Sequence, residues 1–229
     1  MLGLYHARSG LLVLIVAAAP LSASAQRLDC GNPTIDSAHA SDYRTATRMH
    51  LAVVERRHFT ADVRALRRGE STSEIGGDIA YTLRKFPNHY QALLAMGDWS
   101  IKTARNPPAA AGYSVECWFE RARVFAPDDA MVKVAFGIYL LKRGKPREAV
   151  AQLEAARGDD ESNANVHYNL GLAYVETKDF DKAIESAHRA YELGFPLPGL
   201  KDRLERAGKW RDPATPKLSE SADVQADGR

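Results

Sequence analysis

The C-terminal half of the chain shows the hydrophobic and polar pattern of consecutive amphipathic helices. Between residues 130 and 197, apolar side chains return every three or four positions, which is the period of one helix face. Gly144 and Gly194 suit helix ends, and Pro146 suits the first turn of a helix. The pattern therefore predicts helices joined by short turns.

The same region contains an internal repeat. Residues 130–163 and 164–197 are both 34 residues long and align without offset. The aligned pairs are Gly137 with Gly171, Ala149 with Ala183, Ala156 with Ala190, Phe136 with Leu170 and Leu140 with Tyr174. Small residues let two helices approach closely, and larger apolar residues fill the groove between them. Because one helical hairpin cannot bury its own apolar face, we expect neighbouring copies to stack.

The two windows resemble the tetratricopeptide repeat, a helix-turn-helix unit. In the second window the matching positions are Leu170-Gly171, the aromatic Tyr174, and the small residues Ala183 and Ala190. His167 stands at the leading aromatic position, and the closing proline is displaced to Pro196. In the first window Lys133 and Glu161 occupy those two positions. The resemblance implies an all-α fold, a right-handed α-solenoid of helical hairpins.

A looser copy precedes these windows. Residues 88–97 read as the first helix of a hairpin, with Gly97 at the glycine position, and Ala122 and Pro127 fit the end of the second helix. Gly97 lies 40 residues before Gly137 instead of 34, so we expect an insertion in the turn-rich stretch 106–112. The resemblance then covers roughly residues 88–197.

The remaining segments complete the predicted organisation. Its parts are a signal peptide (1–25), an N-terminal arm and helical extension (26–88), a degenerate repeat with an insertion (89–129), two tetratricopeptide repeats (130–163 and 164–197), a capping helix (198–211) and a disordered tail (212–229). The amphipathic stretch 199–210 suits the polar-faced cap that a terminal repeat needs. The tail is predicted from its Pro, Ser, Asp and Lys content.

The N-terminal extension gives weaker local signals. The stretch His50 to Glu55 fits either a helix or a short strand. Thr60 suits the start of a helix that runs to Arg68 and stops at Gly69. Ser71 and Glu74 have the spacing of a capping box. Residues 78–86 read as a helix that ends at Pro87.

The first 25 residues have the pattern of a secretory signal. The apolar run from Leu11 to Ala19 follows His6 and Arg8, and Ala23-Ser24-Ala25 is a small-x-small cleavage site. The run is shorter than the roughly 20 residues that a transmembrane helix needs. We therefore expect export to the periplasm, with cleavage after Ala25 and no transmembrane segment in the mature chain; an uncleaved anchor is the alternative.

Two cysteines remain after Ala25. In an exported protein, Cys30 and Cys117 are most simply joined in a disulfide that ties the N-terminal arm to the helical body. The alternative is two unpaired thiols, with Cys117 buried beside Trp118. Since the chain contains no Cys-x-x-Cys, its cysteines give no support for a redox or zinc site.

Composition and motif searches point away from nucleic-acid binding and catalysis. The net charge of +2 lacks the basic footprint of a dedicated nucleic-acid binder. The stretch 112–116 lacks the second glycine of a nucleophile elbow, and Gly144-Lys145 lacks the upstream glycine of a phosphate loop. His50 and His58 are eight positions apart, and a metal site would need both on one helix face together with a carboxylate. They share a face only if that segment is helical throughout. We expect no enzyme activity, no cofactor and no metal site.

The resemblance also indicates a partner-binding surface. In tetratricopeptide proteins the first helix of each hairpin lines the concave face. The corresponding positions are Leu94, Asp98, Ile101, Val134, Ile138, Leu141, Tyr168, Leu172 and Val175. Most are apolar, so the face suits an amphipathic helix or apolar peptide. Alternatively, residues 45–88 or a second copy of the chain cover it.

These observations favour a non-enzymatic scaffold or adaptor in the bacterial cell envelope that binds a protein or peptide partner. The alternative is a periplasmic module that binds a small ligand or glycan. Its stacking faces would come from Tyr90, Trp99, Tyr113 and Tyr168.

Overall fold

The computed structural model describes residues 30–31 and 40–213. The predicted signal peptide and most of the predicted tail lie outside these residues. The described part is all-α and contains ten helices, with no strand. They are α1 (Arg48–His58), α2 (Ala61–Arg64), α3 (Ile75–Lys85), α4 (Tyr90–Thr103), α5 (Val115–Phe125), α6 (Ala130–Lys142), α7 (Pro146–Asp159), α8 (Ala164–Thr177), α9 (Phe180–Glu192) and α10 (Gly199–Arg206).

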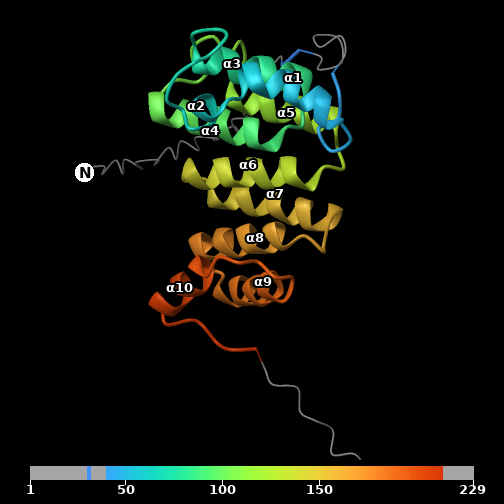
Figure 1. The fold of residues 1–229 in the computed structure, drawn as a ribbon. Helices are drawn as coiled ribbons and strands as arrows, with labels where there is room; N and C mark the ends of the chain where they lie inside the picture. Colours follow the sequence, from blue (N-terminus) through green and yellow to red (C-terminus); the bar gives the residue numbers. More distant parts are fainter. Residues whose placement is uncertain (1–29, 32–39, 214–229) are drawn as a thin grey trace, which may run out of the picture.

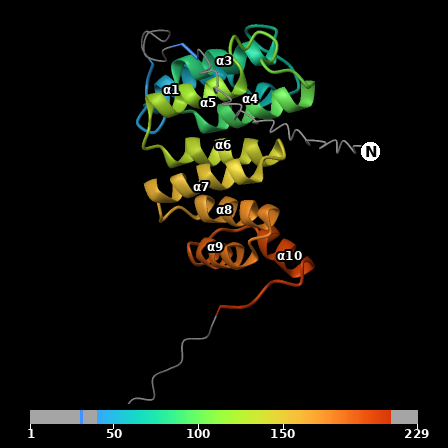
Figure 2. The same ribbon diagram turned by 180° about the vertical axis from the view of Figure 1, so that it is seen from behind.

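The helices stack as hairpins into an elongated solenoid, which runs from α1–α3 at one end to α10 at the other (Figure 1). α6 pairs with α7 and α8 pairs with α9, and the two hairpins join where α7 packs on α8. The first helices of successive hairpins, α4, α6 and α8, also lie side by side. The turned view in Figure 2 shows the same order of layers. The predicted α-solenoid is therefore confirmed for the described residues.

The aligned glycines lie where helices come closest together. A Cβ atom on Gly137 would lie 2.6 Å from Cγ of Leu153 in α7. A Cβ atom on Gly171 would lie 2.4 Å from a methyl carbon of Leu200 in α10. Real Cβ atoms do not approach other atoms this closely. The glycine in each repeat therefore lets the next helix pack against it, α7 through Leu153 and α10 through Leu200.

The N-terminal extension differs in detail from the sequence-based expectation. The stretch His50 to Glu55 lies within α1, which resolves the choice between helix and strand. Thr60 caps α2 as predicted, but α2 ends at Arg64 because Leu66 turns into the left-handed region. The predicted capping box is wrong: the Ser71 hydroxyl donates to the carbonyl of Arg57, and Glu74 is the N-cap of α3 without a side-chain bond.

Asp78 organises this part of the fold. Its side chain is fully buried in the first turn of α3 and accepts hydrogen bonds from the backbone N–H groups of Glu70 and Thr72. Nδ1 of His58 lies 2.8 Å from the same carboxylate, and the imidazole stacks on Tyr81. The carboxylate therefore fixes the loop before α3 in place of the expected capping box.

The core has two clusters of buried side chains that meet at α6. The first cluster joins the N-terminal extension to α4, α5 and one side of α6. The second joins the other side of α6 to α7 through α10. Phe136 packs against both clusters. This arrangement explains why α6 is apolar nearly all round, since a helix buried on two sides needs two apolar faces.

Cys30 and Cys117 form the predicted disulfide. The Arg121 guanidinium adds a hydrogen bond of 2.7 Å to the carbonyl oxygen of Cys30. The disulfide and this hydrogen bond hold residues 30–31 against α5.

At the other end, α10 packs on both α8 and α9. Leu200 and Leu204 are fully buried against the second cluster, while the opposite side of α10 carries charged residues. Arg203 of α10 forms an ion pair of 2.7 Å with Glu176 of α8. The helix thus covers apolar surface that the last hairpin would otherwise expose.

Candidate functional site

The nine residues predicted for the partner-binding surface lie on the first helices of three successive hairpins. Leu94, Asp98 and Ile101 are on α4, Val134, Ile138 and Leu141 on α6, and Tyr168, Leu172 and Val175 on α8. Because these helices lie side by side, the nine positions follow three neighbouring helices. We call the α4–α6–α8 surface that carries them the first-helix face.

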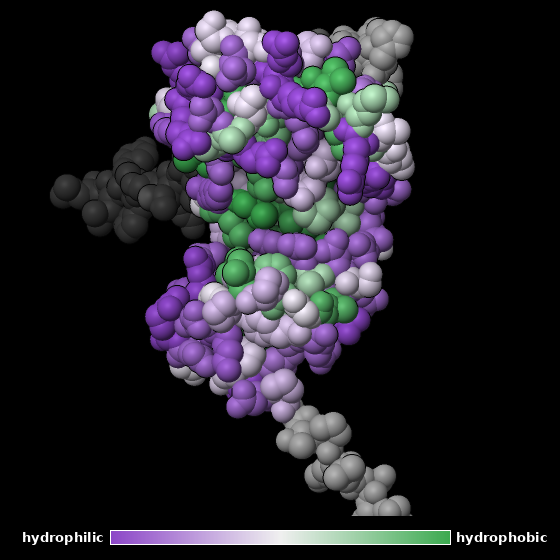
Figure 3. Space-filling model, in the orientation of Figure 1, coloured by the Kyte–Doolittle hydropathy of each residue, from purple (hydrophilic) through white to green (hydrophobic). Residues whose placement is uncertain are grey.

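Most of the apolar residues on this face are accessible to solvent. Ile101 is 38% exposed. The half-buried members are Leu94, Ile138, Leu141, Leu172 and Val175. Hydrophobic side chains gather at the level of α6 to α8 in the space-filling view, where a hydrophilic band crosses them (Figure 3). A run of half-exposed apolar side chains over adjacent helices is a common feature of protein-binding surfaces.

Two of the nine residues have a different environment. Val134 is 1% exposed and belongs to the second core cluster, so it lies beneath the face. Tyr168 stacks on Phe195 at a centroid distance of 4.0 Å. The Tyr168 hydroxyl also lies close to Gly199, at the start of α10. The loop between α9 and α10 therefore covers part of this ring.

One ion pair crosses the face between neighbouring hairpins. Nζ of Lys142 lies 2.5 Å from the carboxylate of Asp98, and both side chains are close to half exposed. Lys142 also lines a cleft with Ile101, Arg105 and Arg143 at the C-terminal ends of α4 and α6. The cleft places positive charge at the edge of the apolar surface.

Residues 40–88 lie at one end of the solenoid and do not extend along the first-helix face. α1 and α2 pack on α3, and α3 packs on α4 (Figures 1 and 2). The half-exposed state of Ile138, Leu141 and Leu172 agrees with this placement. Within the described residues, the segment 45–88 therefore leaves the α6 and α8 part of the face open.

The four aromatic residues considered for glycan stacking do not form one platform. Tyr90, Trp99 and Tyr113 pack against the first core cluster, whereas Tyr168 packs against the second. Tyr113 meets Trp118 edge to face. Aromatic side chains gather instead near α10, where a cleft of about 460 Å³ is lined by Tyr191, Phe195 and Trp210. We call this cleft the aromatic groove; the sequence did not indicate it because its walls come from three separate segments.

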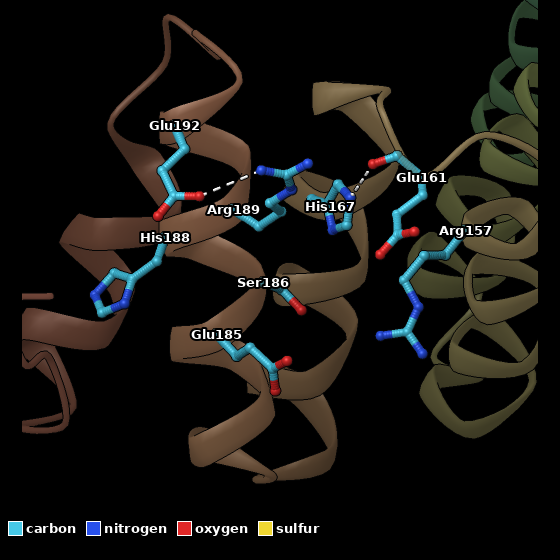
Figure 4. A pocket seen from close by; sticks show the side chains of 8 residues that line it. All are labelled: Arg157, Glu161, His167, Glu185, Ser186, His188, Arg189 and Glu192. Carbon is cyan, nitrogen blue, oxygen red and sulfur yellow. Dashed lines mark hydrogen bonds and ion pairs between the residues drawn. The ribbon is translucent and has the colours of Figure 1, made fainter. Parts of the chain in front are cut away.

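A second feature missed by the sequence is a polar pocket between α7, α8 and α9 (Figure 4). It has a volume of about 270 Å³, and its lining residues are Arg157, Glu161, His167, Glu185, Ser186, His188, Arg189 and Glu192. His188 and Glu192 also line the aromatic groove, so the two cavities adjoin across α9. The only sequence signal was His167 at a position where the repeat usually has a larger aromatic ring.

The part of the chain that the structure describes contains neither a metal-ligand cluster nor a membrane-spanning helix. Across residues 30–31 and 40–213, no three His, Cys, Asp or Glu side chains are grouped so that they could hold a metal ion. No helix in these ranges has both the length and the apolar character needed to span a bilayer.

Residues 134–194 match a family model described as tetratricopeptide repeat. Among solved structures, the chain is similar to MamA AMB-1, at 20% identity and a TM-score of 0.42, with 71% of this chain and 85% of that chain covered. It is also similar to a MamA mutant, at 20% identity and a TM-score of 0.41, with 70% of this chain and 90% of that chain covered. The curated proteins include no match. The family match falls on the hairpins α6–α7 and α8–α9, so this part of the chain is similar to tetratricopeptide repeats.

Proposed function

We propose that this protein is a non-enzymatic scaffold that binds a protein partner on the first-helix face, and that it works in the periplasm of a bacterium. Proteins of this repeat family bind protein partners. The signal pattern in residues 1–25 and the Cys30–Cys117 disulfide support the proposed compartment, because disulfides persist mainly in oxidising environments.

The observation that carries the proposal is the apolar surface on α6 and α8. Ile138, Leu141, Leu172 and Val175 lie on adjacent helices and remain half exposed. A partner helix with apolar residues at helical spacing could bury these side chains together. Each fully buried aliphatic side chain would contribute about 1.5–3 kcal/mol to binding before the costs of association.

A crosslinked pull-down from envelope extract tests the proposal. The bait is the tagged protein, and the test variant carries Ile138→Asp and Leu141→Asp. We expect the parent to capture a specific partner and the variant to lose it, because two carboxylates would have to be desolvated in the interface. Far-ultraviolet circular dichroism and the melting temperature establish that the variant is folded.

A matched control carries Val124→Asp on α5. Val124 is 55% exposed and lies outside the first-helix face, so this change adds a carboxylate to an exposed apolar position without touching the proposed interface. The control should capture the same partner as the parent. Equal capture by the parent, the control and the folded double variant would rule out the first-helix face as the binding surface.

A further inference from the structure

The polar pocket contains two buried polar side chains that each keep an atom free to form a further hydrogen bond. His167 and Ser186 are each 5% exposed. Nε2 of His167 lies 2.7 Å from the carbonyl oxygen of Glu161, and since a carbonyl only accepts, Nε2 carries the proton. In this tautomer Nδ1 is an acceptor, and it has no hydrogen-bond partner among the residues that the structure describes. The Ser186 hydroxyl makes no hydrogen bond to a described residue, and Ser186 lines the same pocket.

The charged residues around the pocket leave a surplus of carboxylates. Arg157 pairs with Glu154 at 2.6 Å, and Arg189 pairs with Glu192 at 3.4 Å, each within its own helix. No ion pair within residues 40–213 involves Glu161 or Glu185. Figure 4 shows that the side chains of Glu161 and Glu185 border the space that His167 and Ser186 face. The pocket is therefore rich in acceptors and favours a cation that can donate several hydrogen bonds.

The preceding repeat provides an internal comparison. The position equivalent to His167 holds Lys133, one repeat length earlier. The ammonium group of Lys133 forms an ion pair with Asp159 at the end of α7. In the next repeat the shorter His167 replaces that lysine, so the chain supplies no ammonium group at the equivalent place. The position equivalent to Asp159 holds Leu193, so the second repeat lacks both members of this ion pair.

We propose that this pocket binds the arginine or lysine side chain of a peptide ligand, an inference that rests on the proposed role in protein binding. The guanidinium or ammonium group donates to the carboxylates of Glu161 and Glu185, to Nδ1 of His167 and to the Ser186 hydroxyl. A peptide is favoured over a free amine because the aromatic groove adjoins the pocket through His188 and Glu192. Residues next to the basic side chain can thus place an apolar group against Tyr191 or Trp210.

The test is a titration of ¹⁵N-labelled protein, followed by backbone amide chemical shifts. The probes are N-acetyl-arginine-methylamide, its lysine counterpart and its citrulline counterpart, which keeps the shape of arginine without the charge. We expect saturable shifts at His167 and Ser186 with the two cationic probes only. A tetrapeptide with a tryptophan or proline beside the arginine should bind more tightly and also shift the amides of Tyr191 and Trp210.

Substitutions of lining residues test whether the probes bind in this pocket. Glu185→Gln and Ser186→Ala should each weaken binding of the arginine probe by about three- to tenfold, because each removes one acceptor from a charge-assisted contact. Glu148→Gln on α7 is the matched control, since Glu148 is exposed, pairs with Lys145 and lies outside the pocket. The control should bind as the parent does.

Three results would overturn the inference. Equal shifts with the citrulline probe would mean that charge is not recognised, and no shift with any probe would mean that the pocket is not a site. Putrescine binding as tightly as the tetrapeptide would mean that the ligand is a small amine and not a peptide. None of these results depends on partner capture by the first-helix face, which the Ile138→Asp and Leu141→Asp variant tests separately.

Discussion

Gly137 and Gly158 show how the surroundings of a residue decide the effect of one methyl group. Both are helical glycines close together in the chain, at α6 and α7. A Cβ atom on Gly137 would collide with buried Leu153, whereas a Cβ atom on Gly158 would meet nothing within 4 Å. In open space, alanine is the better helix former because it loses less backbone entropy than glycine.

We therefore predict opposite effects for two chemically identical substitutions. Gly137→Ala should lower the free energy of unfolding by about 1–3 kcal/mol, since Leu153 must leave its rotamer or separate the helices. Gly158→Ala should leave stability unchanged or raise it by up to about 1 kcal/mol. Urea unfolding of both variants beside the parent measures the difference. Similar destabilisation by both would show that the close approach at Gly137 does not control packing.

The lowered pKa of Asp42 makes its contribution to the stability of the fold depend on pH. The Arg44 guanidinium hydrogen-bonds to this carboxylate and, against some opposing desolvation, lowers the pKa of Asp42 from 3.8 to about 2, with help from the Asn88 amide. Because the folded pKa is the lower one, this stabilisation is present above about pH 4 and is lost as the pH falls through about 2.

Replacing Arg44 should return the pKa of Asp42 toward 3.8. Carboxyl ¹³C chemical shifts, followed from pH 6 to pH 1.5, report the pKa of Asp42 in the parent and in Arg44→Ala. Arg123→Ala is the control, since Arg123 pairs with Glu120 on α5 and not with Asp42. A parent Asp42 that titrates near pH 4 would contradict the ion pair seen in the structure.

At the scale of helices, the sequence predicts best where one signal repeats. The two 34-residue windows place α6 to α9 because each small residue in one copy is supported by its counterpart in the other. The extension before α4 has single, local signals, and tertiary contacts override them. The Ser71 side chain bonds to Arg57 because Asp78 already holds the loop before α3. No pattern within residues 69–74 could reveal this.

Prediction of the candidate sites has the same limit, because the sequence does not show which tertiary contacts a side chain makes. Positions on the first-helix face follow from helical spacing once the repeat is recognised, although spacing did not show that Val134 is buried or that Phe195 covers Tyr168. The polar pocket depends on which side chains lack partners after folding. His167 and Ser186 are 19 positions apart in the sequence, and only the packing of α8 on α9 brings them to one cavity.

The disulfide connects elements that no short-range signal joins. It closes a loop across 87 positions, so the chain-entropy model gives a stabilisation of about 4–5 kcal/mol relative to the reduced protein. We predict that Cys30→Ser with Cys117→Ser lowers the free energy of unfolding by up to this amount, because the unfolded chain gains conformations. Guanidinium unfolding with and without reductant measures it.

The double serine variant also serves as the control for the reductant. A reductant should destabilise the parent and leave this variant unchanged, since the variant has no cysteine left after the predicted cleavage site. Equal stability of parent and variant under oxidising conditions would show that the bond does not constrain the unfolded chain.

Over the whole molecule, the two core clusters meet through one helix. α6 places Val132, Ala135 and Tyr139 in the first cluster. Ala130, Val134 and Leu140 of the same helix belong to the second cluster. Phe136 contacts both and stacks on Phe119 at a centroid distance of 4.6 Å. In a solenoid, cooperative unfolding depends on such contacts between neighbouring units, because distant units do not touch.

Phe136→Ala should therefore change the form of the unfolding transition as well as its midpoint. Trp99 and Trp118 report on the first cluster, and Trp210 reports on the second. In single-tryptophan versions of the parent, fluorescence from either cluster should give one midpoint in urea. In Phe136→Ala the two midpoints should separate, since the interface between the clusters is weakened more than either cluster itself. Phe180→Ala removes a similar, half-buried ring from the second cluster alone and leaves the contacts at α6 in place. It should therefore lower the midpoint reported by both clusters by the same amount, so that the two midpoints still coincide. Coincident midpoints in Phe136→Ala would mean that other contacts of α6, such as those of Tyr139 and Val134, already suffice to make the solenoid unfold as one unit.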